Sequence, residues 1–127
     1  QSAIASEAGE ASRERALAKQ ERKLGGAQLG LRAVEWKLNQ ALREVGIDRA
    51  GRSLEWLEEE LRMRRYELDK KLEKPGISSR QRQSLEEKRG LIAEAEYRLE
   101  KVKRQADEVG RLQVAIAALK PRALAAK

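Results

Sequence analysis

Apolar residues recur every three or four positions in long stretches of this chain, and polar turns separate the stretches. In the first stretch they form one narrow stripe, made of Leu24, Ala27, Leu31, Val34, Leu38, Ala41 and Val45. A later stretch repeats the spacing with Leu85, Ile92, Ala95, Leu99, Val102, Ala106 and Val109. Lys88 takes one position of that second stripe. This spacing is typical of helices that pack side by side in a coiled coil or bundle.

Two glycine-containing turns divide the pattern into three helices. We expect them over about residues 3–45, 53–74 and 79–120. Ser53 can cap the second helix, and Pro75 with Gly76 marks its end, because proline cannot continue a helix and glycine tolerates positive φ. The sequence therefore predicts one all-α domain over residues 1–127, an elongated antiparallel bundle or coiled coil of three or four long helices.

The number of helices depends on glycines inside the long stretches. Gly25, Gly26 and Gly30 each cost about 1 kcal/mol relative to alanine in a helix interior. The apolar stripe nevertheless keeps its phase through them, which favours a continuous first helix. A break at Gly25 and Gly26, or at Gly110, would give a fourth helix.

The second helix is about half as long as its neighbours, so in an up-down-up arrangement the outer helices have unmatched ends. The apolar residues of these ends are Ile4, Leu17, Val109, Leu112, Ile116 and Leu119. We expect a fourth helix, a second copy of the chain or another partner to cover them.

The composition argues against enzymatic chemistry. The chain has no Cys and no His, so disulfides, thiolate catalysis and cysteine zinc sites are excluded, and the usual side chain for proton transfer is missing. Carboxylates such as Glu94 and Glu96 lie among Arg and Lys on predicted helices, without a pocket that would remove them from water as acid catalysis requires. We expect no catalytic residues, no cofactor and no metal.

Hydropathy and the start of the chain bear on location. No run of eighteen apolar residues and no signal peptide is visible, so we expect a soluble protein whose compartment the sequence does not indicate.

A second set of apolar residues lies off the main stripes. Leu29 and Trp36 are seven residues apart, and so are Trp56 and Met63. One interpretation is that each helix packs against two neighbours in the bundle. The other is an exposed docking face, because Trp is enriched at binding hot spots. On that second interpretation Trp36, Trp56 and Met63 are the candidate partner-binding residues.

The function that this pattern favours is a non-enzymatic protein-interaction or assembly module. We expect it to be a segment of a larger protein and to bind a protein partner or a second copy of itself. The turn from Lys74 to Ser79, followed by Arg80, Arg82 and Leu85, resembles helical-hairpin turns of phage structural proteins and bacterial secreted effectors. That resemblance implies a helical targeting, docking or assembly segment.

The alternative is a peripheral membrane-targeting bundle. The net charge is +7, and most of the excess lies between Lys101 and the C-terminus. In the first turn Ile47 stands close to Arg49 and Arg52, so this tip is a candidate site for anionic lipid head groups.

Nucleic-acid binding through basic helices is a third possibility. It is less favoured, because the eight basic and eight acidic residues between Gly46 and Ser78 cancel, and no aromatic stacking motif is present.

Overall fold

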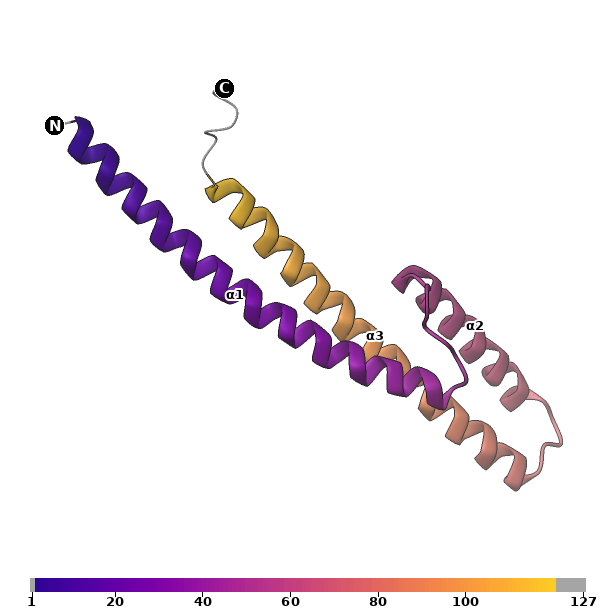
Figure 1. Cartoon of the computed structure of the whole chain (residues 1–127). Helices are drawn as coiled ribbons and strands as arrows, with labels where there is room; N and C mark the ends of the chain where they lie inside the picture. The colour runs from indigo at the N-terminus through magenta and orange to yellow at the C-terminus, as the bar shows by residue number, and fades with distance from the viewer. Residues whose placement is uncertain (1, 121–127) are drawn as a thin grey trace. The chain divides into compact units, whose positions relative to one another are not determined.

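The computed structural model describes residues 2–120, and the side chains of residues 9–120, as three α-helices joined by two loops (Figure 1). They are α1 (Ser2–Glu44), α2 (Leu54–Glu73) and α3 (Ser79–Leu119). No strand occurs between Ser2 and Lys120, so the predicted all-α class is confirmed. Helix α1 continues through Gly25 and Gly26, and α3 continues through Gly110.

Local sequence explains where the helices begin and end. Gly46 has φ +75°, which ends α1, and Gly76 has φ +82° in the turn after α2. The Ser53 hydroxyl accepts a hydrogen bond from the backbone N–H of Trp56 at 3.1 Å and caps α2. Before α3, Ser78 and Gln81 bond reciprocally, each side chain accepting from the other's backbone N–H, which is a capping box.

The chain divides into two compact units. Residues 32–104 form unit 2, which contains the end of α1, all of α2 and most of α3. In this unit α2 and α3 are antiparallel, and three ion pairs tie them together: Glu58–Lys103, Arg65–Glu96 and Asp69–Arg89. The largest fully buried side chains of its core come from all three helices: Leu38, Leu42, Leu57, Leu61 and Val102. These contacts fit the predicted bundle.

The direction of α2 differs from the expected up-down-up order. Within unit 2, α2 runs parallel to the end of α1, and α3 is antiparallel to both (Figure 1). The physical reason is the loop between α1 and α2. This loop turns back along α1, because the Arg49 side chain contacts Glu35 at 3.6 Å and Asn39 at 3.5 Å. Glu35 and Asn39 each lie at least one turn before the end of α1.

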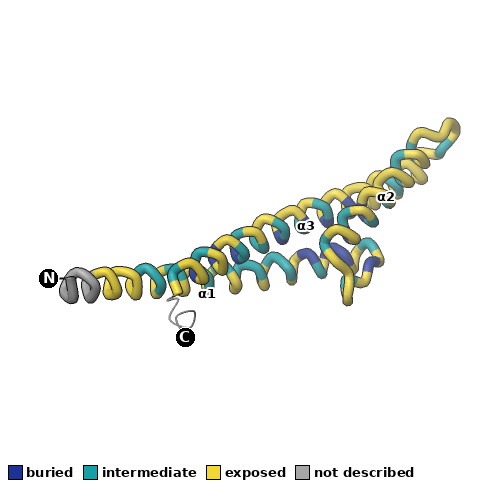
Figure 2. Tube along the Cα trace, turned by 90° about the horizontal axis from the view of Figure 1, so that it is seen from above, coloured by how far each residue is buried: buried dark blue, intermediate teal, exposed yellow. Residues whose placement is uncertain are grey.

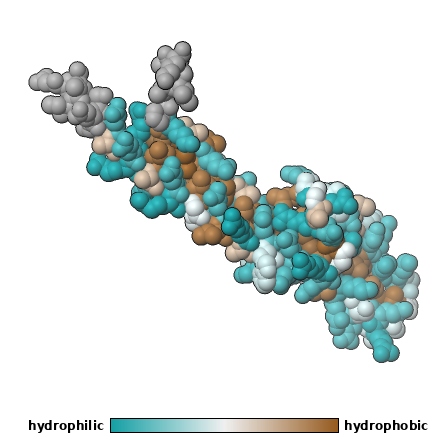
Figure 3. Space-filling view, in the orientation of Figure 1, coloured by the Kyte–Doolittle hydropathy of each residue, from teal (hydrophilic) through white to brown (hydrophobic). Residues whose placement is uncertain are grey.

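Within the described residues, unit 1 consists of residues 2–31 and 105–120. Here the first part of α1 lies beside the last part of α3, and Val109, Leu112 and Ile116 are buried between them. Figure 3 shows apolar side chains along the line where these two helices meet. The expectation that these ends are unmatched is therefore wrong for these residues, because antiparallel α1 and α3 pair with each other. The side chain of Ile4 lies outside the described residues.

The glycines of α1 allow a test of the continuous helix. A Cβ added at Gly25 or Gly26 would meet no atom within 4 Å. We expect the double variant Gly25→Ala/Gly26→Ala to raise the free energy of unfolding by about 1–2 kcal/mol, since alanine is the better helix former. Urea unfolding followed by circular dichroism measures this gain.

Gly30 provides the matched control. A Cβ there would lie 2.9 Å from the Nε2 atom of Gln105, which donates a hydrogen bond to the carbonyl of Ala27. Gly30→Ala must displace this side chain, and it is expected to gain less stability than Gly25→Ala or Gly26→Ala made singly. A loss of stability in the double variant would contradict an unbroken α1.

Candidate protein interface

The sequence singled out Trp36, Trp56 and Met63 as partner-binding candidates, and all three are exposed. The exposed fractions are 61% for Trp36, 36% for Trp56 and 52% for Met63. The interpretation that they belong to the bundle core is therefore wrong for the described part of the chain. Trp36 projects from α1 two positions before the buried Leu38, on the opposite side of the helix.

Trp56 and Met63 lie on one face of α2, which we call the outer face. Its five residues follow at intervals of three and four, and all are exposed: Trp56, Glu59, Met63, Tyr66 and Lys70. This spacing places them in one row along the helix. Tyr66 was not among the residues predicted from the sequence to bind a partner, although its interval of three from Met63 places it in the row.

Neighbouring cations cover part of the two aromatic rings. The Arg52 guanidinium lies 4.3 Å from the ring centroid of Trp56, and the Lys70 ammonium lies 4.8 Å from that of Tyr66. Such cation–π contacts hold a ring in place while one of its sides stays available. Glu59 pairs with Arg62 at 2.7 Å, three residues further on. The outer face therefore combines apolar, acidic and basic groups.

The opposite side of α2 fixes the direction in which the outer face points. Leu57 and Leu61 are buried in the core of unit 2. Glu58 accepts a hydrogen bond from the Lys103 ammonium, and this bond, with the positive charges of Lys103 and Arg62, lowers the pKa of Glu58 below its ordinary value of 4.5. Because Leu57, Leu61 and Glu58 fix the opposite side of α2 against the rest of unit 2, the outer face is directed away from the core. Figure 2 shows this helix as mostly exposed.

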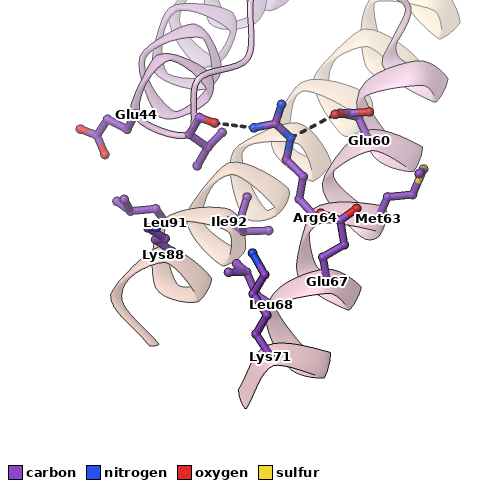
Figure 4. A pocket seen from close by; sticks show the side chains of 11 residues that line it. Glu44, Glu60, Met63, Arg64, Glu67, Leu68, Lys71, Lys88, Leu91 and Ile92 are labelled. Carbon is purple, nitrogen blue, oxygen red and sulfur yellow. Dashed lines mark hydrogen bonds and ion pairs between the residues drawn. The ribbon is translucent and has the colours of Figure 1, made fainter. Parts of the chain in front are cut away.

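A groove of about 460 Å³ opens where α1 ends, between α2 and α3 (Figure 4). It is lined by Glu44, Val45, Glu60, Met63, Arg64, Glu67, Leu68, Lys71, Lys88, Leu91 and Ile92. Arg64 dominates its chemistry, because its guanidinium donates to the carbonyl of Val45 at 2.6 Å and to Glu60 at 3.0 Å. Arg64 thus satisfies a carbonyl just beyond the end of α1, which fits a structural role.

The predicted lipid-binding tip does not present an apolar residue. Ile47 is buried, with 4% of its surface exposed. Its backbone N–H donates to the carbonyl of Leu42 at 2.9 Å, which draws it back against the end of α1. Arg49 is engaged with α1, and Arg52 stacks on Trp56. The expectation that Ile47 is an apolar group available to lipid beside Arg49 and Arg52 is therefore wrong.

Residues 2–120 also bear on metal binding and on membrane crossing. In that part of the chain no group of three or more His, Cys, Asp or Glu is arranged to hold a metal ion. None of its helices combines the length and the apolar character needed to cross a membrane. Comparisons with protein-family models, curated proteins and solved structures find no match to the chain.

Proposed function

We propose that the chain is a non-enzymatic protein-interaction or assembly module that binds its partner through the outer face of α2. The observation that carries this proposal is the row of Trp56, Met63 and Tyr66, three large side chains left exposed on a helix whose other side is buried. Trp and Tyr recur at binding hot spots, because they remove much apolar surface from water while keeping one polar group.

The arrangement suits a helical partner. Residues spaced by three and four from Trp56 to Lys70 present a strip that another helix can contact over several turns. The Trp36 side chain is a separate exposed position on α1, and it is not required for contact with this strip.

The double variant Trp56→Ala/Met63→Ala tests the proposal. We expect it to keep the helical content and unfolding midpoint of the wild type, because both side chains are exposed, and to lose at least about 2 kcal/mol of partner-binding free energy. Capture from an extract, identification of the captured protein and titration of that purified protein give the measurement.

Tyr97→Ala is the matched control, since Tyr97 is an exposed aromatic residue on α3, with 51% of its surface accessible. It should bind like the wild type. Unfolding of the double variant, or equal binding by all three proteins, would contradict the proposal. Binding to anionic vesicles, with no protein bound, would favour the membrane alternative instead.

A further inference from the structure

We infer that the partner of the outer face of α2 is a second copy of the same chain, with the two α2 helices packed antiparallel about a two-fold axis. This inference rests on the proposed function and specifies its partner. It is carried by the order of charges along the exposed row.

Four residues of the row form a self-complementary series. Glu59, Met63, Tyr66 and Lys70 follow at intervals of four, three and four, so the spacing is the same when read in either direction. An acid stands at one end, a base at the other, and two apolar residues lie between them. All four side chains are exposed. When a second copy runs in the opposite direction, each charged residue therefore faces an opposite charge and each apolar residue faces an apolar one.

The register follows from these intervals. When Glu59 of one α2 lies opposite Lys70 of an antiparallel copy, Met63 lies opposite Tyr66, and the two-fold axis repeats both contacts. The centre of the interface is then a thioether against an aromatic ring, which is a favourable contact. Each end is closed by an ion pair between the two copies.

The same four residues disfavour a parallel arrangement of the two α2 helices. In a parallel, in-register pair Glu59 would face Glu59 and Lys70 would face Lys70, so like charges would meet at both ends of the apolar centre. Like charges held close across an interface weaken association. The antiparallel register replaces both repulsions with attractions.

The contact is small, which sets the expected affinity. Helix α2 has 20 residues and is about 30 Å long, so the two copies would share only a few turns of apolar contact. We expect a reversible dimer rather than an obligate one.

Sedimentation velocity of the full chain, from roughly 1 µM to 1 mM, tests this inference. The wild type should move from monomer to dimer within that range. Glu59→Lys and Lys70→Glu should each weaken the dimer by about tenfold or more, because each creates two like-charge pairs across the axis. Circular dichroism checks that both variants remain folded.

Rescue identifies the register. The double variant Glu59→Lys/Lys70→Glu, and an equimolar mixture of the two single variants, should both dimerise like the wild type. Within one helix these two residues are about 16 Å apart, too far to pair with each other, so rescue requires contact between chains. Glu86→Lys, an exposed charge reversal on α3, is the control and should leave the dimer unchanged.

Three results would overturn the inference: a monomer at every concentration, a dimer insensitive to the single reversals, or a sensitive dimer that neither the double variant nor the mixture restores. A strict monomer that still binds another protein through Trp56 and Met63 would overturn the second copy as partner and leave the proposed function standing. A dimer with the charge pattern described above supports both.

Discussion

Replacing Leu61 with alanine is expected to lower the free energy of unfolding by about 3 kcal/mol, within the range of about 2–5 kcal/mol for a buried leucine. Leu61 is fully buried in unit 2, where α2 packs on its neighbours. The variant loses the apolar surface of the side chain and leaves a cavity that surrounding helices fill only in part. A domain with thin helical contacts has few other residues to compensate.

Urea unfolding followed by far-ultraviolet circular dichroism measures this loss. Met63→Ala is the matched control, because Met63 lies two positions further along α2 and is exposed. Its free energy of unfolding should change by less than about 0.5 kcal/mol. Equal losses in the two variants would mean that the buried and exposed sides of α2 are assigned wrongly.

Ile47→Asp is expected to destabilise the chain by more than about 3 kcal/mol, since it removes a buried apolar side chain and places a carboxylate where water is excluded. Ile47 is 4% exposed. Because this residue anchors the loop that turns back along α1, the variant should also loosen the position of α2. The expected readouts are a lower unfolding midpoint and a reduced helical signal at equal temperature.

Ala50→Asp introduces the same charge at an exposed position in the same loop and serves as the control. Its stability should stay close to that of the wild type. If Ile47→Asp instead keeps full stability and abolishes binding to anionic vesicles, Ile47 is a surface residue in solution. That result would support the membrane-targeting alternative, with Ile47 in its lipid-binding site.

Part of the candidate interface was predictable from the sequence. The interval of seven between Trp56 and Met63 marks both as lying on one face away from the main stripe. Periodicity cannot say whether such a face is covered, because coverage depends on where the neighbouring helices lie. The sequence therefore left a buried and an exposed interpretation open, and periodicity within one helix does not relate Trp36 of α1 to Trp56 and Met63 of α2.

What the sequence determined by itself is local: the helical stretches, their caps and the turns at Gly46 and Gly76, because these depend on residues a few positions apart. Only the tertiary structure decided the direction of α2 and the burial of Ile47. Both follow from contacts made across the loop, such as that of Arg49 with Glu35. A turn between two helices permits either direction, and side chains distant in sequence select one of them.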